Sequence, residues 1–228
     1  MQNSMETNTH YIEKVYERLL EAITRGELKP GERVRQAVLA ERLGVSRQPI
    51  SHALQLLRHQ GLLRDAGKQG VEVTPVNDEY IFHLYQARVS LEPLAASLSA
   101  ERIKNRQAPE ARVEAMRTAL EIGHENLSSG APVYLMVKAD SRFHMSIYQL
   151  SGNSAVSAMM AGQWPHLMRS MLMVLDHPAV PTRAWEEHAT IARHILNGSA
   201  AAAAEAATQH VERARLELID RLKNTSRS

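Results

Sequence analysis

The chain has 228 residues and a formal net charge of +2, from 27 Lys and Arg against 25 Asp and Glu. This near balance excludes a protein that coats nucleic acid with a uniformly basic surface. The absence of cysteine excludes disulfides and thiolate metal sites, and no apolar run approaches the ~20 residues that span a bilayer. We therefore expect a cytoplasmic protein without a membrane partner. Its fold should be mainly α-helical, because aromatic residues make up only 4% of the chain while Ala and Leu are abundant.

The N-terminal residues 1–10 lack the basic and apolar pattern of a signal peptide, and we expect them to form a disordered leader. The apolar residues that follow recur with a helical period and predict a first helix over residues 11–25. Gly26 ends this helix, and residues 28–31 form a turn around Pro30.

Residues 39–57 are the most informative segment, because they combine two short amphipathic helices with a turn at Gly44. The apolar faces of these helices consist of Leu39, Ala40 and Leu43 in the first and Ile50, Ala53, Leu54 and Leu57 in the second. Ser46 is a favourable N-cap for the second helix, and Pro49 lies in its first turn, where a missing N–H costs little. Two helices joined by a short turn indicate a helix-turn-helix, which reads DNA through its second helix.

A β-hairpin is expected directly after these helices. Gly61 ends the second helix, residues 62–64 begin a strand, residues 65–70 form a glycine-containing loop and residues 71–73 return as a second strand. Three helices followed by such a hairpin predict a winged helix-turn-helix DNA-binding domain over residues 11–74.

Positive charge gathers in this region. Between Arg33 and Gly70 seven basic residues stand against two acidic ones, whereas residues 76–228 carry sixteen of each sign. The excess favours attraction to phosphates, and Arg47, at the start of the second helix, can pair bidentately with guanine. Arg33 and Arg35 are either phosphate contacts or solvated charges, and the wing tip is another candidate contact. The full set of expected DNA contacts is Arg33, Arg35, Ser46, Arg47, Gln48, Ser51, His52, Lys68, Gln69 and Gly70.

Residues 75–78 contain the expected linker, and helical patterns continue beyond them over residues 79–228. Breaks at Gly, Pro and Asn predict six helices, over residues 79–105, 109–127, 133–150, 154–175, 182–196 and 200–223. Residues 177–181 should form a loop, with Thr182 as the cap of the fifth helix. The short connections favour an antiparallel all-α bundle.

Four polar residues of this bundle have the chemistry of a metal site. Asp140 and His144 are spaced i, i+4 and project from one helix face, while His188 and His210 lie on the fifth and sixth helices. A carboxylate with imidazoles on facing helices can hold a divalent metal ion, and these donors suit Zn, Ni, Fe, Mn or Co. The competing interpretation is that the histidines are ordinary core or surface residues, since the chain has 11 of them.

Several short segments occur together in a characteristic order. The N-terminal ones are residues 26–32, residues 39–49, Ala53-Leu54, Gly61-Leu62 and Gly70. The C-terminal ones are Arg88 with Glu92, Asp140 with Phe143-His144, Ser151-Gly152-Asn153, Glu187-His188 with Ile191, and His210. With these segments the chain resembles the GntR family of bacterial transcription regulators, in the FadR-type subgroup with an FCD effector domain. The resemblance covers nearly the whole chain from residue 11 onward.

The resemblance implies that Asp140, His144, His188 and His210 are the ligands of a divalent metal ion. It also implies a small organic acid, a carboxylate, as effector. A homodimer would place two winged helices on a pseudo-palindromic operator in double-stranded DNA. We therefore expect a ligand-responsive transcription regulator of the repressor type, in which residues 79–228 bind metal and effector and form the dimer.

The recognition helix departs from the family pattern. Ser51, followed by His52, stands where many members have a second arginine, and Ala37 replaces an arginine found in part of the family. We expect either a different operator half-site or binding that is weaker by one bidentate contact, about 1–3 kcal/mol.

Arg88 is the expected clamp for a carboxylate of the effector, with Arg169 as a second candidate. A structural pair between Arg88 and Glu92, one helical turn later, explains the same residues equally well. The alternative function is a metal-dependent hydrolase with an accessory DNA-binding head, since such a metal can activate water. That chemistry needs a general base, and Glu187 points about 100° away from its neighbour His188 on a helix. We therefore expect a regulator that is not an enzyme.

Overall fold

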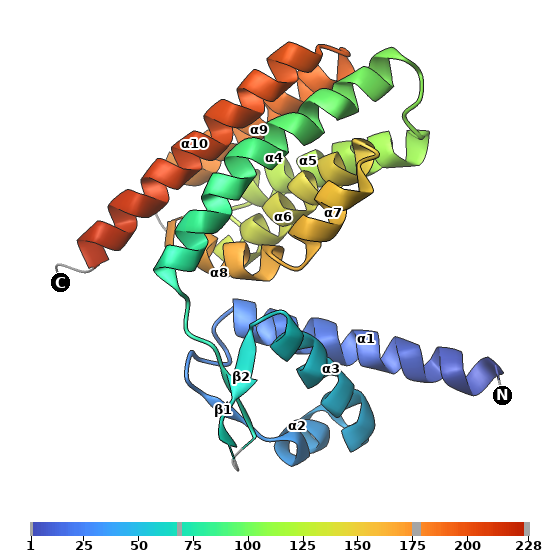
Figure 1. Ribbon diagram of the computed structural model, residues 1–228, viewed down its shortest axis with the longest axis vertical. Helices are drawn as coiled ribbons and strands as arrows, with labels where there is room; N and C mark the ends of the chain where they lie inside the picture. Colours follow the sequence, from blue (N-terminus) through green and yellow to red (C-terminus); the bar gives the residue numbers. More distant parts are fainter. Residues whose placement is uncertain (1, 68–69, 175–178, 226–228) are drawn as a thin grey trace. The chain divides into compact units, whose positions relative to one another are not determined.

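The computed structural model describes residues 2–67, 70–174 and 179–225, and the chain divides between Val76 and Asn77 into two units (Figure 1). Each unit is described here by itself. The expected wing-tip residues Lys68 and Gln69 lie outside the described residues, as do residues 177 and 178 of the expected loop.

Over its described residues, the first unit contains three helices and a small antiparallel sheet. Its elements are α1 (Gln2–Thr24), β1 (Arg33–Val34), α2 (Gln36–Leu43), α3 (Arg47–His59), β2 (Leu63–Asp65) and β3 (Val71–Val73). The sheet has the order β1-β3-β2, and Leu63 pairs with Val73 while Val34 pairs with Val71. This is the winged helix-turn-helix that the sequence predicts.

The apolar faces predicted for the two motif helices are buried in the core of this unit. The buried members are Leu39 and Ala40 of α2 and Ile50, Ala53, Leu54 and Leu57 of α3, which join residues of α1, including Val15 and Leu19. Leu43, also predicted for this face, is half-buried and packs against the same core. Gly44 ends α2 with a φ of 64°, a left-handed conformation that glycine adopts without strain. That conformation lets the chain turn sharply into α3.

Two details of the first unit differ from the prediction. The first helix begins at Gln2, so a disordered leader is wrong for residues 2–10. These residues have no apolar stripe of their own, and they continue a helix whose buried face starts at Val15. The strand β1 was missed because it is only two residues long and pairs with β3, far along the chain.

The second unit is entirely helical over its described residues, as predicted. Its elements are α4 (Asp78–Lys104), α5 (Glu110–Ser128), α6 (Val133–Leu150), α7 (Ser154–Ala161), α8 (Trp164–Val174), α9 (Ala179–Leu196) and α10 (Ala200–Thr225). The long helices α4 and α10 lie side by side along this unit (Figure 1). Asn77 caps α4, because its side-chain oxygen accepts a hydrogen bond from the backbone N–H of Tyr80 at 2.9 Å.

Two helix boundaries in this unit were predicted wrongly. The segment expected as one helix over residues 154–175 is divided into α7 and α8. The break lies at Gly162 and Gln163, and it places Pro165 in the first turn of α8, where its missing backbone N–H costs little. The helix α9 begins at Ala179 rather than at Thr182, which places Pro181 in its first turn for the same reason.

None of the helices over the described residues is both long enough and apolar enough to cross a bilayer.

Candidate functional site

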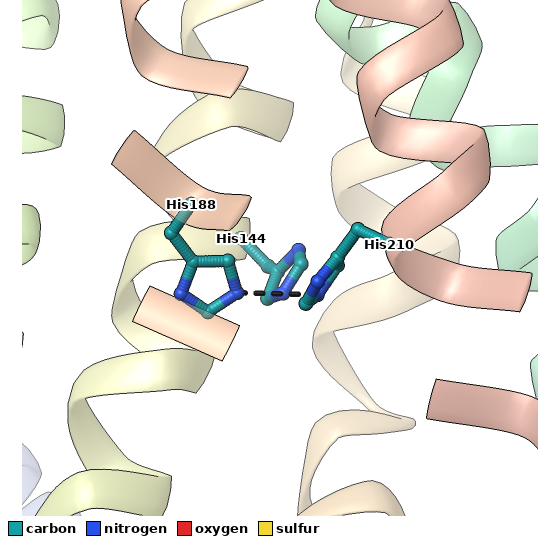
Figure 2. A group of neighbouring side chains, drawn as sticks. All are labelled: His144, His188 and His210. Atoms are coloured by element: carbon teal, nitrogen blue, oxygen red, sulfur yellow. Dashed lines mark hydrogen bonds between the residues drawn. The ribbon is translucent and has the colours of Figure 1, made fainter. Parts of the chain in front are cut away.

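The four predicted metal ligands converge inside the second unit. Asp140 and His144 project from α6, His188 from α9 and His210 from α10, and all four side chains are buried. The three histidines each offer a ring nitrogen within 4.8 Å of the others. Figure 2 shows the three rings turned toward one another, with a contact of 3.1 Å between Nε2 of His188 and Nε2 of His210.

The spacing of these atoms fits a common metal ion. Oδ1 of Asp140 lies 3.5 Å from Nε2 of His188, and Oδ2 lies 3.8 Å from Nε2 of His144. Two ligand atoms bound about 2.1 Å from one ion lie roughly 3–3.4 Å apart in octahedral or tetrahedral geometry. The contact at 3.1 Å lies within that range, the contact at 3.5 Å lies just above it, and the contact at 3.8 Å needs a small inward movement.

Two carboxylates outside this cluster fix the orientation of two of its rings. Nδ1 of His144 donates to Oε2 of Glu92 at 2.7 Å, and Nδ1 of His210 donates to Oε2 of Glu187 at 2.8 Å. An ionised carboxylate only accepts hydrogen bonds, so the proton stays on Nδ1 and Nε2 keeps its lone pair. Carboxylate–histidine pairs of this kind orient metal ligands and raise their basicity.

Sequence reasoning missed both of these roles. The expected structural pair is present, because Nε of Arg88 donates to Oε1 of Glu92 at 2.5 Å, but Glu92 also accepts from Tyr148 and His144. Glu187 points away from its neighbour His188, as helix geometry requires, and contacts His210 on α10 instead. The i, i+4 spacing of Arg88 and Glu92 predicts their contact with each other, but it does not predict the contact of Glu92 with His144.

Burial and charge set the protonation of the cluster. Burial favours the neutral acid of Glu92, but the charge of Arg88 and the hydrogen bond from His144 outweigh it and hold the pKa of Glu92 well below its usual range. Burial lowers the pKa of His188 well below its usual range, and the neighbouring His210 and His144 act in the same direction. His188 is therefore neutral near pH 7, the form that binds metals.

Two buried atoms of the cluster have no hydrogen-bond partner among the described residues, namely Oδ2 of Asp140 and Nδ1 of His188. Since Nε2 of His210 is an acceptor, His188 donates to it through Nε2, and its own Nδ1 then has nothing to accept. Leaving such atoms unpaired costs about 1–3 kcal/mol each. A cation bound by Asp140 and the Nε2 atoms would satisfy Oδ2 of Asp140 and would move the proton of His188 to Nδ1. Three imidazoles and a carboxylate are a ligand set that fits Zn, Ni, Fe, Mn or Co.

The two expected effector residues lie in different surroundings. Arg88 is fully buried and, with Tyr85, Asp140 and His210, lines a small pocket of about 40 Å³. Its Nη1 has no hydrogen-bond partner in the described part of the chain, although Nε and Nη2 contact Glu92 and His144. Arg169 is also buried, on α8, but is not among the described residues that line this pocket. The geometry therefore favours Arg88.

The expected DNA contacts lie on the first unit. Arg47, Gln48 and His52 are exposed on α3, while Ser51 is half-buried. Ser46 occupies the N-cap position of α3, but its side chain makes no capping hydrogen bond. The remaining described members are also exposed, namely Arg33 on β1, Arg35 before α2 and Gly70 before β3. Their contact with DNA stays a prediction.

Comparisons with known proteins identify both units. Residues 11–73 match the model of the bacterial regulatory proteins of the gntR family, and residues 83–213 match the FCD domain. The chain is 27% identical over 209 residues to the uncharacterized HTH-type transcriptional regulator YdhC of Bacillus subtilis, covering 91% of this chain and 88% of the relative. It is 25% identical over 207 residues to a probable D-xylose utilization operon transcriptional repressor of Paenarthrobacter nicotinovorans, covering 90% and 87%.

Among solved structures, McbR/YncC of E. coli has the same fold. It superposes with a TM-score of 0.78 at 20% identity, over 93% of this chain and 98% of the other. The family and these relatives are transcription regulators rather than enzymes, so the hydrolase alternative has no support. The chain therefore belongs to the GntR family of bacterial transcription regulators and joins the family's DNA-binding domain to an FCD domain.

Proposed function

We propose that this regulator is a homodimeric repressor that senses a small carboxylate at a metal ion held by Asp140, His144, His188 and His210. One observation carries the proposal: three buried imidazoles converge on one point, and carboxylates hold two of them with Nε2 available as a ligand. A merely structural histidine cluster has no need of that arrangement.

The bound metal ion would supply a Lewis-acidic anchor for a carboxylate oxygen of the effector. Arg88 is suited to hold the other oxygen, because it lines the same pocket as Asp140 and His210 and its Nη1 is otherwise unpartnered among the described residues. Glu92 keeps Arg88 oriented through the contact at 2.5 Å and neutralises part of its charge.

The site is well placed to change how the helices pack. Its ligands and their carboxylate partners come from α4, α6, α9 and α10. An effector bound there would therefore act on the packing of four helices. The helix α4 follows β3 of the wing after only residues 74–77. An effector that binds one packing of these helices better than another would shift the population of the DNA-binding state.

DNA binding itself would rest on α3, where Arg47 is the proposed base-reading residue. Two copies related by a two-fold axis would bind a pseudo-palindromic operator in the cytoplasm. Ser51 and His52 differ from the family pattern, and we propose that they give this regulator a distinct operator sequence.

The direct test measures operator affinity by fluorescence anisotropy, using the promoter region beside the protein's own gene. Zn(II)-loaded protein is titrated with and without a panel of small carboxylates, and His188→Ala serves as the variant without a complete site. We expect at least one carboxylate to change the operator affinity of the loaded wild type and to leave His188→Ala unaffected. No binding to the promoter region at any salt concentration, or an equal carboxylate response in His188→Ala, would contradict the proposal.

A further inference from the structure

Four charged side chains from α9 and α10 form an ion network beside the metal cluster. Arg183 donates through Nη2 to Glu217, and its Nε lies 3.6 Å from Oε1 of Glu187. Arg213 donates to the same Glu187, which also holds His210. The network thus connects a predicted metal ligand to the surface of the unit.

An inner pocket and an outer groove are both lined by residues of this network. Arg183, Glu187 and Glu217 line the small inner pocket together with Arg88 and Asp140. Arg183 and Glu187 also line an outer groove of about 250 Å³, together with Thr190, Gln209 and Arg213. The side chains of Arg183 and Glu187 therefore form the boundary between the proposed effector pocket and the outside.

The inner pocket is too small for an organic acid as it stands. Its volume of about 40 Å³ holds roughly three water molecules. Arg88 and Asp140 are enclosed by other helices, whereas the side chain of Arg183 is 36% exposed and that of Glu217 is 24% exposed. The ends of Arg183 and Glu217 are consequently the groups that can move with the least loss of packing when a ligand enters.

We propose that Arg183 is a second anion-binding residue of the effector site, and that an acidic group of the effector replaces Glu217 as its partner. Arg183 now holds a carboxylate, and a second carboxylate can replace it with the same geometry. The effector is then a dicarboxylate, with one acid group at the metal and Arg88 and the other at Arg183. This inference rests on the proposed function, since it needs the metal-anchored site.

The proposal predicts that substitutions of Arg183 and of Glu217, the two partners of one ion pair, change dicarboxylate affinity in opposite directions. Arg183→Met removes the partner of the second carboxylate and should weaken dicarboxylate binding about 10–100-fold, the effect of a lost charge-assisted hydrogen bond. Glu217→Gln removes the competing carboxylate and should strengthen dicarboxylate binding about threefold or more. Arg183→Lys keeps the charge without the planar fork and should fall between wild type and Arg183→Met. A pair with only a structural role would make Arg183→Met and Glu217→Gln act in the same direction.

The experiment uses the Zn(II)-loaded full chain and isothermal titration calorimetry. The probes are malonate, succinate and glutarate, each compared with the monocarboxylate of equal carbon number, namely propionate, butyrate and valerate. Arg193→Met, an exposed arginine on the same helix, is the matched control and should behave like wild type.

We expect one dicarboxylate to bind at least about tenfold more tightly than its monocarboxylate counterpart, with that preference lost in Arg183→Met and enlarged in Glu217→Gln. Equal affinity for the members of every pair overturns the inference, as does weakening by both substitutions. If Zn(II) fails to bind, or if every monocarboxylate and every dicarboxylate fails to bind, the proposed function itself is refuted. If they bind without any preference for two acid groups, only the role of Arg183 is refuted.

Discussion

The packing of Gly123 against Trp185 makes a sharp prediction about the scaffold of the metal cluster. Gly123 lies inside α5, and a Cβ added there would meet three atoms of the Trp185 ring, all closer than the 3.4–4 Å of ordinary van der Waals contact. Trp185 is buried, and its ring packs edge-on against His188 with the ring centroids 4.7 Å apart. Gly123→Ala therefore displaces an indole ring that contacts a proposed metal ligand.

Two opposing effects set the change in the free energy of unfolding that Gly123→Ala causes. In an unconstrained helix, replacing Gly by Ala stabilises by about 0.5–1 kcal/mol. Overpacking a well-filled core costs about 1–3 kcal/mol and occasionally more, and the ring has little space into which it can move. We expect Gly123→Ala to lower the free energy of unfolding by about 1–3 kcal/mol, which corresponds to roughly 2–4 °C in Tm for each kcal/mol.

Tryptophan fluorescence is the suitable assay, because both tryptophans of the chain, Trp164 and Trp185, lie in the second unit. The control is Gly162→Ala: Gly162 ends α7 with a φ of −75° and has open space where the Cβ would be. That variant should be at least as stable as wild type, with a gain of up to about 1 kcal/mol. In a Trp185→Phe background the smaller ring leaves room, and Gly123→Ala should become neutral or stabilising. Unchanged stability of the single variant Gly123→Ala would refute the reasoning.

Three further predictions concern metal and DNA. Glu187→Gln should weaken Zn(II) binding about 10–100-fold in a chelator competition, because it removes the carboxylate that orients His210. The exposed neighbour gives the control, and Glu186→Gln should bind Zn(II) like wild type. Equal affinity of the two variants for Zn(II) would count against the orienting role of Glu187. Loading with Zn(II) at 100 times its Kd should add about 2.7 kcal/mol of stability, seen as a higher fluorescence-detected Tm that EDTA reverses, and a Tm indifferent to both reagents would argue against a site in this unit. Arg47→Ala should weaken operator binding by about 1–3 kcal/mol in anisotropy titrations. Arg25→Ala, which removes an arginine paired with Glu21 and Glu27, should leave operator affinity unchanged. An equal loss of affinity in both variants would indicate non-specific attraction to DNA phosphates rather than base reading by Arg47.

The sequence was most informative where local patterns decide the structure. The apolar faces of α2 and α3, the turn at Gly44 and the glycine-rich hairpin depend on neighbouring residues, and all are present as predicted. The helical character of the second unit likewise follows from periodicity and breaks. The convergence of the three histidines, with Asp140 beside His144 and His188, was expected from the resemblance, while the role of these residues as ligands stays a prediction.

What the sequence left open depends on contacts between distant segments. Whether Glu92 reaches His144, or Glu187 reaches His210, is set by how α4, α6, α9 and α10 pack, and no local spacing encodes it. The break between α7 and α8 precedes Pro165, but a proline alone does not decide where a helix ends, since Pro93 lies inside the continuous helix α4. The pairing of β1 with β3 involves too few residues to leave a pattern.

The central claim is that Asp140 and the three histidines hold a metal ion, and metal content per chain tests it most directly. The protein is purified without chelator and the bound metal is measured by mass spectrometry, for wild type and for Asp140→Ala. The account predicts one equivalent of a divalent transition metal ion in wild type and a large loss in the variant. Wild-type protein that neither retains such an ion nor takes one up from an equimolar Zn(II) solution would contradict it.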